Sequence, residues 1–385
     1  MTSRTALLTG ATGFLGSSLA VQLLHTDRRR VYCLVRPKGD IAARLHAAVR
    51  AAADAAGIEH GLDRQFDRLV PLAGDIGLPG LGLTPEDRQR LEADRPDEVW
   101  HAAASLRYED RHRDEIITTN VNGTTNLVEA VAELCVPELN HISTAYVAGS
   151  KVGDVREEPY DPEFESNNWY EASKRQGEDV VVSHAARFAR VRIMRPSIVV
   201  GTLSTYRSSS DSGYYGFLRG LERFCRVVER RERGYLDRHE VKLLVEPHSS
   251  LNLVPIDVLV EEAVALADDP GEAGRYFHLT NPFPNTIERA RIGPESSIDR
   301  LRLDLVEERG LLGEYDALLD DALDFYRPYL RNDKRFIRER DGGSPPDAIR
   351  ISDEDLAALS IVHFEQKRRP ARANPIGPAF ECVET

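Results

Sequence analysis

A tyrosine and a lysine four residues apart give the strongest chemical signal in this 385-residue sequence. Tyr170 and Lys174 belong to the string YEASK, and side chains at this spacing project from one face of a helix. A free phenol has a pKa of about 10 and relays protons poorly near neutral pH. We expect the nearby Lys174 ammonium to lower the pKa of Tyr170. The pair is then suited to exchange a proton with a carbonyl or alcohol oxygen.

A threonine is expected beside this pair. Thr144 follows a predicted strand over residues 139–143, within the string HISTAYVAG. Its hydroxyl is placed to hydrogen-bond the same substrate oxygen. A Tyr-x-x-x-Lys spacing alone is a frequent accident, and the threonine gives it weight. We therefore predict that Thr144, Tyr170 and Lys174 form one catalytic set.

A glycine-rich loop lies near the N-terminus, between a predicted strand over residues 6–9 and a predicted helix over residues 14–24. Small residues in such a loop let the backbone approach the pyrophosphate of a dinucleotide, and the helix N-terminus offers free N–H groups. A tight turn without a ligand is the alternative. The residues predicted to bind the cofactor here are Thr9, Gly10, Thr12, Gly13, Phe14, Leu15 and Gly16.

The end of the second predicted strand, residues 31–35, bears on the choice of cofactor. An NAD site usually carries Asp or Glu at this point, where the carboxylate accepts hydrogen bonds from the ribose hydroxyls. Here the strand is followed by Arg36 and Lys38, whose charges suit a 2′-phosphate. We therefore predict NADPH as the cofactor, the alternative being that Arg36 is a solvated strand end.

Later turns complete the predicted cofactor site. Asp75 follows a predicted strand over residues 69–73 and is placed to accept a hydrogen bond from the adenine amino group, with Ile76 packing on the ring. Small side chains in the string HAAA let the backbone at Ala103 lie against the cofactor. We interpret His101 of the same string as an ordinary half-buried histidine in preference to a catalytic one. Lys174 is also placed to hold the nicotinamide ribose.

Short apolar strands alternating with helices must position these residues. The predicted strands cover residues 6–9, 31–35, 69–73, 98–100, 139–143 and 191–194, and the helices between them cover 14–24, 41–56, 118–135 and 170–187. Such alternation is typical of a parallel sheet covered on both faces, which predicts a Rossmann-type, doubly wound α/β fold.

Two domains are predicted. The NADP-binding Rossmann domain covers residues 1–201 and is completed by about residues 241–282. After residue 201 the alternation of strands and helices fails. Residues 202–240 and 283–385 are predicted to form a smaller, mainly helical substrate-binding region.

The motifs resemble those of the extended short-chain dehydrogenase/reductase superfamily. Ten strings occur in order over roughly residues 5–282: TGATGFLG, VYCLVR, AGD, HAAA, NVNGT, STAYVAG, YEASK, RPSIVVG, NLVPID and FHLTNP. They resemble most the branch that holds fatty acyl-CoA reductases and the thioester-reductase domains of carboxylic acid reductases and nonribosomal peptide synthetases. The string FYRPYL, residues 325–330, is similar to that branch more weakly.

This resemblance implies roles for particular residues. It implies that Thr144, Tyr170 and Lys174 are the catalytic triad. It also implies that the segment 195–199, with Pro196 and Ile198, borders the nicotinamide. Asn120, in NVNGT, is expected to bond backbone across the sheet rather than to do chemistry. The sequence departs from the branch at Arg175, where relatives often carry Trp, and in the serine-rich loop 208–215, which bears on the substrate more than on the chemistry.

The resemblance implies NADPH-dependent reduction of an acyl thioester, bound to CoA or to a carrier protein, to an aldehyde. The motifs leave open whether a second reduction gives the alcohol. One alternative is an extended ketone or aldehyde reductase, or an alcohol dehydrogenase. Another is an NAD-dependent sugar-nucleotide epimerase or dehydratase, which Arg36 disfavours. A redox sensor that holds NADPH without turnover is disfavoured by the complete triad.

An arginine row is expected in the substrate region. On a predicted helix over residues 217–233 the spacing 4, 3, 4, 3 places on one face Arg219, Arg223, Arg226, Arg230 and Arg233. One hypothesis is that this Arg219–Arg233 stripe docks an anion attached to the substrate, either the phosphates of CoA or an acidic acyl or peptidyl carrier protein. The alternative is a solvated face whose arginines pair with neighbouring glutamates.

The composition excludes several classes of protein. With 41% hydrophobic and 29% charged residues, the chain is not wholly disordered, and its net charge of −13 argues against nonspecific nucleic-acid binding. Four scattered cysteines predict neither a disulfide framework nor a metal site, and they suit a cytoplasmic location. No apolar run is long enough for a predicted membrane span, and we interpret the glycine-interrupted N-terminal run as structure rather than a signal peptide.

Overall fold

Seven parallel strands form the central sheet. The computed structural model describes residues 4–26, 28–58, 63–271, 274–339 and 350–368. The strand order is β12-β7-β5-β4-β1-β2-β3, and neighbours in this sheet run parallel. The strands are β1 (Arg4–Thr9), β2 (Arg28–Val35), β3 (Leu69–Ala73), β4 (Glu98–His101), β5 (Glu138–Ile142), β7 (Arg190–Pro196) and β12 (Tyr276–Leu279). This is the order of a doubly wound sheet, so the predicted Rossmann-type fold is confirmed.

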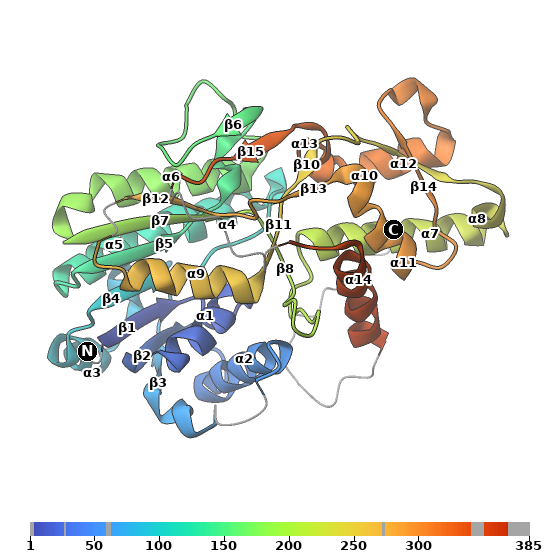
Figure 1. Ribbon diagram of the computed structural model, residues 1–385. Coiled ribbons are helices and arrows are strands. Elements are labelled where there is room, and N and C mark those ends of the chain that lie inside the picture. The colour runs from blue at the N-terminus through green and yellow to red at the C-terminus, as the bar shows by residue number, and fades with distance from the viewer. Residues whose placement is uncertain (1–3, 27, 59–62, 272–273, 340–349, 369–385) are drawn as a thin grey trace.

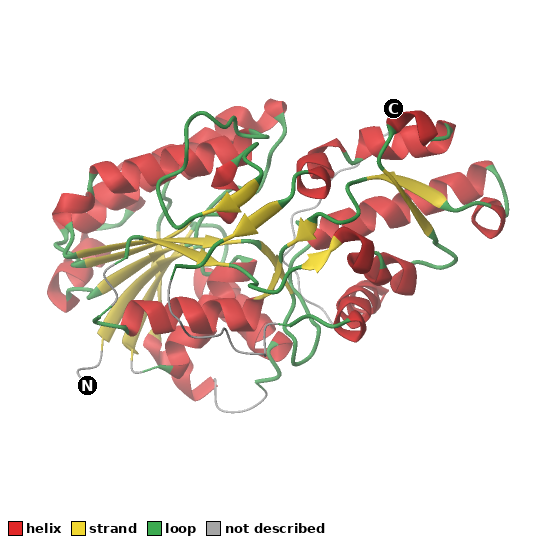
Figure 2. Cartoon of the chain, turned by 45° about the horizontal axis from the view of Figure 1, so that its top comes forward, coloured by secondary structure: helices red, strands yellow, loops and turns green. Residues whose placement is uncertain are grey.

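Helices cover both faces of this sheet (Figure 1, Figure 2). One face packs against α1 (Phe14–His25), α2 (Ile41–Ala55) and α9 (Ile256–Asp268). The opposite face packs against α3 (Pro85–Asp94), α5 (Gly123–Glu133) and α6 (Trp169–Ser183). The central strands β1 and β4 are almost wholly buried, and β1 accordingly has a short apolar run rather than an alternating pattern.

The strand register brings the carboxyl ends of the strands together. Thr9 at the end of β1 pairs with His101 at the end of β4, and His101 pairs with His141 in β5. The strand order reverses between β1 and β4. Ligands of doubly wound sheets bind at this switch point. The glycine loop follows β1 directly, so the fold places the loop there.

A smaller region lies beside the carboxyl edge of the sheet, on the right in Figure 1, and has an apolar cluster of its own. Its elements, with the short strands that adjoin it, are β6 (Gly153–Val155), β8 (Ile198–Val200), α7 (Tyr214–Arg231), α8 (Tyr235–Arg238), β9 (Val241–Leu244), β10 (Ser250–Leu251), β11 (Leu253–Pro255), β13 (Asn285–Thr286), α10 (Ile287–Ala290), α11 (Ile292–Ser297), β14 (Leu303–Val306), α12 (Glu314–Ala322), α13 (Arg327–Arg331), β15 (Lys334–Phe336) and α14 (Asp353–Arg368). None of the described helices is both long and apolar enough to cross a membrane.

Strand β9 lies with this smaller region. It pairs with β14, and its Val241 and Leu243 belong to the smaller region's apolar cluster, whereas α9 and β12 join the sheet. The segment predicted to complete the Rossmann domain from about residue 241 therefore begins with a strand that packs elsewhere. A short apolar strand suits either sheet, so its local sequence does not identify its partner. The division into two domains stays a proposal, and residues 369–385 of it lie outside the described chain.

One predicted helix is interrupted. The apolar spacing predicts a helix over residues 118–135, but the structure has α4 (Arg113–Ile117), a π-helical turn over Thr118–Asn122, and then α5. Such turns occur frequently at functional sites. The buried residue in this turn is Asn120.

Candidate active site

The glycine loop passes against the end of β4 at backbone contact distance. Gly10 has a φ of +77°, and a Cβ there would lie 2.7 Å from the Ala102 carbonyl carbon and the Ala103 nitrogen. A Cβ on Gly16 would lie 2.1 Å from the Gly10 oxygen. Gly13 caps α1 without a side-chain hydrogen bond, so no side chain competes for the first N–H groups of the helix. These residues fit a dinucleotide pyrophosphate.

A chain of buried polar side chains links the loop to α5. The Thr9 hydroxyl lies 2.8 Å from His101 Nδ1, and His101 Nε2 lies 3.0 Å from the Thr124 hydroxyl, which donates to the Asn120 carbonyl. Thr9 also accepts a hydrogen bond from the Ala103 backbone. Burial, and then the charge of Lys174, lower the pKa of His101 to about 3. A neutral imidazole with both nitrogens engaged supports the structural interpretation of His101.

The three predicted catalytic side chains come together at the carboxyl end of β5. The Thr144 side chain lies near enough to the Tyr170 phenol to influence its pKa. Thr144 also donates a long hydrogen bond, 3.4 Å, to the Pro196 carbonyl. Lys174, one turn further along α6, is buried and donates from Nζ to the Ile142 carbonyl at 2.7 Å. Thr144 directly follows β5, and Lys174 bonds the last residue of that strand, so both lie at the same sheet edge.

Burial decides the protonation of this set. It raises the pKa of Tyr170 well above its ordinary value; the Thr144 side chain opposes this shift, and the Glu171 charge adds to it. Burial also lowers the pKa of Lys174 to about 8. The expectation that the ammonium lowers the pKa of Tyr170 is therefore wrong for this structure, because the cost of burying the phenolate exceeds any help from the amine. The phenol stays protonated near neutral pH and is available as a proton donor.

The turn after β2 is held so that two cations face solvent. Arg36 and Lys38 are both exposed. Their backbone carbonyls accept hydrogen bonds of 2.8 and 2.9 Å from the guanidinium of Arg44. Asp40, two residues after Lys38, caps α2 by accepting from the Ala43 backbone at 2.9 Å. Sequence reasoning missed Arg44, whose only local signal was its place in the first turn of α2.

Asp75 and Ile76 occupy the turn after β3. Asp75 Oδ1 accepts from the Gly77 backbone at 2.9 Å, so the carboxylate is fixed in a tight turn. The Ile76 carbonyl accepts from Asn126 at 2.7 Å. The Ile76 side chain is buried against Gly123 at the start of α5. Contact of either residue with an adenine ring stays a prediction.

Asn120 organises backbone, as expected. Its Oδ1 accepts from the Ser105 backbone N–H at 2.7 Å, and its Nδ2 donates to the Ser105 carbonyl at 3.0 Å. The same amide donates to the Ser173 hydroxyl on α6 at 2.8 Å. The loop after β4 is thereby attached to the helix that carries Tyr170 and Lys174.

The predicted nicotinamide border lies next to Thr144. β7 ends at Pro196, which pairs with Leu279 at the end of β12, and Ile198 opens β8. Between them and α6 lies a buried ion pair: Arg195 donates from Nε and Nη2 to the Glu178 carboxylate at 2.9 and 2.6 Å. This pair fixes α6 on the sheet one turn beyond Lys174.

Arg175 accounts for the first departure from the family pattern. Its guanidinium donates to the Val147 carbonyl at 2.7 Å and to the Phe164 carbonyl at 2.6 Å, and it lies over the Tyr160 ring. It therefore holds the loop that follows Thr144 and the loop that precedes α6. An apolar side chain at this position would leave those carbonyls without these donors.

The serine-rich loop packs on α14. The Ser208 backbone donates to Gln366, and Lys367 pairs with Asp211 at 2.7 Å. Hydroxyls of Ser208 and Ser210 accept from backbone N–H groups two residues later, which folds the loop into consecutive tight turns. Sequence reasoning placed this loop near the substrate, and its described contacts are structural.

Aromatic residues that sequence reasoning missed join the two regions beside Tyr170. Tyr108, in the loop after β4, stacks on Phe325 with ring centroids 3.6 Å apart. Trp169 donates from Nε1 to Asp110 at 2.7 Å, and Tyr326 meets Phe217 of α7 edge to face. The signals were the string FYRPYL and the aromatic residue directly before Tyr170. These contacts attach the segment 325–326 to the loop after β4 and to α7.

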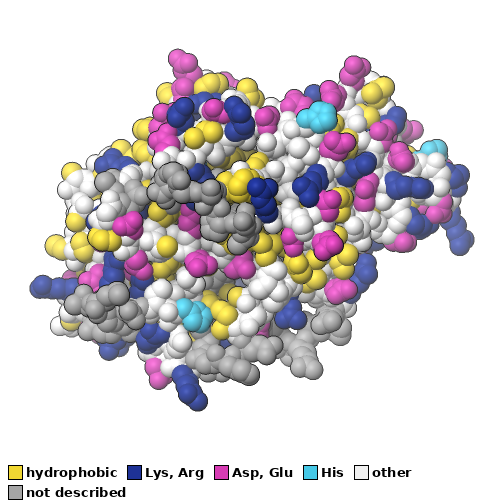
Figure 3. Space-filling model, viewed as in Figure 1, with side chains coloured by type: hydrophobic (Ala, Val, Ile, Leu, Met, Phe, Trp, Pro, Cys, Tyr) yellow, Lys and Arg dark blue, Asp and Glu magenta, His cyan; other side chains and the backbone are white. Residues whose placement is uncertain are grey.

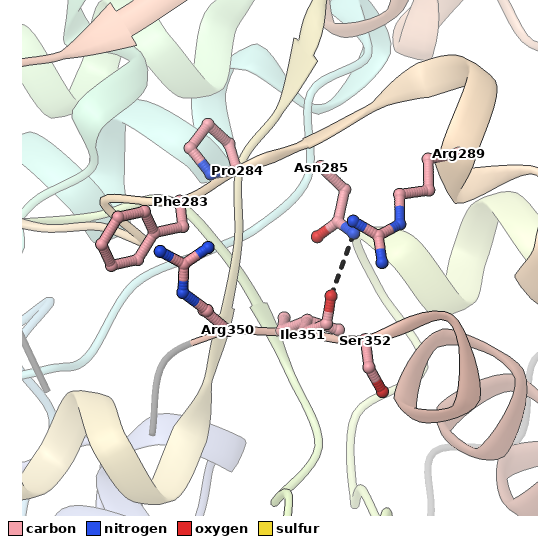
Figure 4. Close-up of a pocket in the computed structure, with 7 residues that line it drawn as sticks. All are labelled: Phe283, Pro284, Asn285, Arg289, Arg350, Ile351 and Ser352. Carbon is pink, nitrogen blue, oxygen red and sulfur yellow. Dashed lines mark hydrogen bonds between the residues drawn. The ribbon is translucent and has the colours of Figure 1, made fainter. Parts of the chain in front are cut away.

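A cavity of about 430 Å³ lies elsewhere, and none of the predicted site residues lines it. It is lined by Phe283, Pro284, Asn285, Arg289, Arg350, Ile351 and Ser352 (Figure 4). Arg350 lies 3.9 Å over the Phe283 ring, and Arg289 pairs with Asp353. Its cations are therefore engaged within the protein. Among the described residues, no group of three or more His, Cys, Asp or Glu side chains is arranged to hold a metal ion.

The doubly wound sheet, the glycine cradle at its switch point and the polar set beside it define a dinucleotide-binding oxidoreductase of the extended short-chain dehydrogenase/reductase type. Comparison with known families narrows this class. Residues 8–263 match the NAD_binding_4 family, described as male sterility protein, and the chain belongs to that family.

Named relatives agree with this assignment. Fatty acyl-CoA reductase wat of Drosophila melanogaster is 25% identical over 312 residues, which cover 74% of this chain and 57% of that protein. Nonribosomal peptide synthetase asaC of Aspergillus flavus is 28% identical over 291 residues, 72% of this chain and 26% of that protein. The crystal structure of the terminal R domain from the myxalamid PKS-NRPS pathway superposes with a TM-score of 0.73 at 25% identity, covering 95% of this chain and 92% of that one. The chain spans about half the length of the Drosophila relatives it matches.

Proposed function

We propose that the chain is an NADPH-dependent reductase that converts an acyl thioester, bound to CoA or to a carrier protein, into an aldehyde. The observation that carries the proposal is the placement of Thr144, Tyr170 and the buried Lys174 at the end of β5, on the sheet edge where the glycine loop lies. Relatives named as a fatty acyl-CoA reductase and as a peptide synthetase favour a thioester over a simple ketone. Residues 202–240 and 283–385 are the proposed substrate-binding region.

The residues of the chain have distinct roles in this proposal. Bound NADPH supplies the hydride. Negative charge grows on the carbonyl oxygen, and hydroxyls of Thr144 and Tyr170 donate hydrogen bonds to it. The 3.4 Å bond from Thr144 to Pro196 is long enough to be given up for this stronger acceptor. Tyr170 then gives its proton, and Lys174 orients the cofactor and supports Tyr170.

The remaining step needs no further group. The hemithioacetal formed by hydride and proton addition loses its thiol, which leaves the aldehyde. A second hydride and proton would give the alcohol through the same three side chains. The same residues serve one round or two, so the products decide between them.

Product analysis tests the proposal. NADPH is incubated with a panel of acyl-CoA thioesters, ketones and sugar nucleotides, and the products are identified by mass spectrometry. We expect aldehyde or alcohol from thioesters, and a Tyr170→Phe variant slower by roughly 10²- to 10⁴-fold. Turnover of ketones alone would replace the proposal by a ketone or aldehyde reductase. Sugar-nucleotide conversion without net NADPH oxidation would replace it by an epimerase or dehydratase.

We also propose that the Arg219–Arg233 stripe docks the anionic carrier of the substrate. All five arginines are exposed, and Lys and Arg side chains gather over α7 and α8 on the right in Figure 3. The predicted helix over residues 217–233 ends earlier, at Arg231, so Arg233 lies beyond α7 and the other four arginines lie on it. Arg226 pairs with Glu222 at 3.0 Å. The other glutamates of this helix are engaged elsewhere: Glu229 accepts from the Gly234 and Leu236 backbone. Within the described chain, Arg223 and Arg230 have no carboxylate partner, so their charges are available to an acidic partner.

Charge reversal tests the docking proposal. Arg223→Glu combined with Arg230→Glu should slow turnover of CoA-bound or carrier-bound substrate and spare reduction of a small free aldehyde. A matched control reverses two exposed arginines away from α7, with Arg90→Glu and Arg187→Glu. Equal effects on bound and free substrates, or equal loss in the control, would reject docking at this stripe.

A further inference from the structure

The residue after Tyr170 is a fully buried carboxylate. Glu171 has no exposed surface. Its Oε2 accepts from the backbone and the side-chain amide of Asn167 at 2.8 and 2.9 Å. Its Oε1 accepts from the Tyr329 hydroxyl at 2.8 Å, and Tyr329 lies 158 residues further along the chain. The hydrogen bonds to this one buried carboxylate therefore come from two segments that are far apart in the sequence.

The same hydroxyl reaches the cap of α6. Asn168 caps the helix, since its Oδ1 accepts from the Glu171 backbone N–H at 3.0 Å. Its Nδ2 donates to the Tyr329 hydroxyl, also at 3.0 Å. Tyr329 thus bridges Asn168 and Glu171, and the residues between these two are Trp169 and Tyr170. The first turn of the helix that carries the proposed proton donor is closed by a phenol from the smaller region.

The surroundings of Tyr329 make this bridge rigid. Its ring meets Tyr146 edge to face with centroids 4.8 Å apart, and Tyr146 also meets Phe336. Phe336 lies in β15, which pairs with β6. Lys334 of the same strand is buried, and its positive charge acts on Glu171. Ring packing, strand pairing and an opposite charge all hold the smaller region against this turn of α6.

We propose that Tyr329 is a positioning residue for Tyr170: by bridging Asn168 and Glu171 it fixes the first turn of α6, and with it the direction of the Tyr170 hydroxyl towards Thr144. This inference rests on the proposed function of Tyr170. Tyr329 touches neither Thr144 nor Lys174 in any described contact, so it acts through the helix. The string FYRPYL, which no step of the chemistry uses, acquires a role in this way.

Kinetics of Tyr329→Phe test the inference. The variant keeps the ring and loses only the bridging hydroxyl. We expect kcat to fall roughly 10- to 100-fold, as for a misplacement of about 1 Å, while KM for NADPH stays within about twofold of the parent. Tyr315→Phe is the matched control: it removes a phenol hydroxyl in the same region, from a ring that contacts Tyr235, and should leave kcat unchanged.

Two further measurements separate positioning from general loss of structure. Asn168→Ser keeps a capping oxygen and removes the amide that donates to Tyr329, so the double variant with Tyr329→Phe should be no slower than the slower single variant. Hydrogen exchange is measured on the parent and on Tyr329→Phe, both without cofactor. The variant should exchange faster than the parent only in peptides that cover the first turn of α6.

The outcomes are distinct. A Tyr329→Phe kcat within about twofold of the parent, or an equal loss in Tyr315→Phe, rejects the positioning role. So does exchange that accelerates across the whole molecule, or additive losses in the double variant. If Tyr170→Phe keeps the parent rate, the proposed function fails. That variant leaves Tyr329 unchanged, so its result tests the proposed function separately from the positioning role.

Discussion

Replacing Lys174 with methionine should stabilise the protein while it removes activity. The side chain is buried, and burial lowers its pKa from 10.5 to about 8. At neutral pH the folded protein thus holds an ammonium that its surroundings disfavour. That pKa difference corresponds to roughly 3 kcal/mol of stability lost to the buried charge. Methionine has a similar shape and no charge, but it leaves the Ile142 carbonyl without its donor, at a cost of about 1 kcal/mol.

The sign follows from where the proton is held. Below about pH 8, Lys174 is protonated in both folded and unfolded states, and the full cost of burial is present. Between about pH 8 and 10.5 the folded protein has released a proton that the unfolded chain keeps, so parent stability rises with pH. The variant should therefore be more stable by roughly 2 kcal/mol at pH 7, and this advantage should disappear towards pH 10.5.

Urea unfolding of both proteins at pH 7 and pH 10 measures this difference. Lys38→Met is the control, because Lys38 is exposed and its replacement should change stability by less than about 0.5 kcal/mol. A Lys174→Met protein that is less stable than the parent at pH 7 would refute the reasoning. So would a stability difference that does not depend on pH between these two values.

Three other changes have expected outcomes. Arg36→Ala should raise KM for NADPH roughly 10- to 100-fold, because it removes a charge-assisted hydrogen bond to the 2′-phosphate, and it should change KM for NADH little. Equal changes in KM for the two cofactors in steady-state kinetics would contradict selectivity for NADPH. Gly16→Ala would place a Cβ 2.1 Å from the Gly10 oxygen. It should lower the free energy of unfolding in urea by roughly 1–3 kcal/mol and weaken NADPH binding in a fluorescence titration. Gly310→Ala is the control, because a Cβ there has no atom within 4 Å. Arg195→Leu should cost roughly 3–5 kcal/mol in urea unfolding, because it leaves the Glu178 carboxylate buried and alone, and adding Glu178→Leu should restore much of it.

The sheet and the cofactor loop were predictable because their signals are local. A strand buried on both faces reads as an apolar run, and the glycines between β1 and α1 are required by contacts of the backbone itself. The spacing of Tyr170 and Lys174 is likewise a helical spacing, and both lie on α6, where Lys174 bonds the last residue of β5. Local patterns therefore predicted the segments that form the sheet and the candidate set, whereas the order of the strands across the sheet comes from the structure.

What the sequence could not provide depends on burial and on distant partners. The predicted direction of the Tyr170 pKa shift was wrong because the sequence alone does not show how deeply the phenol is buried. The contact of Glu171 with Tyr329 joins residues 158 apart, with no periodicity to announce it. The pairing of β9 with β14 is a similar case, since an apolar strand of four residues suits many neighbours.

Tyr329 and the residues that it bridges are far apart in the sequence, so they leave the ribosome at different times during translation. Translation proceeds from the N-terminus, so β1 to β7 and α6 emerge well before β12 and α13. A nascent chain can bury most of its parallel strands, yet it has no phenol to close the start of α6 until residue 329 has left the exit tunnel. With the proposed role of Tyr329, the first turn of α6 is completed only after the strands and the glycine loop of the cofactor cradle have left the ribosome.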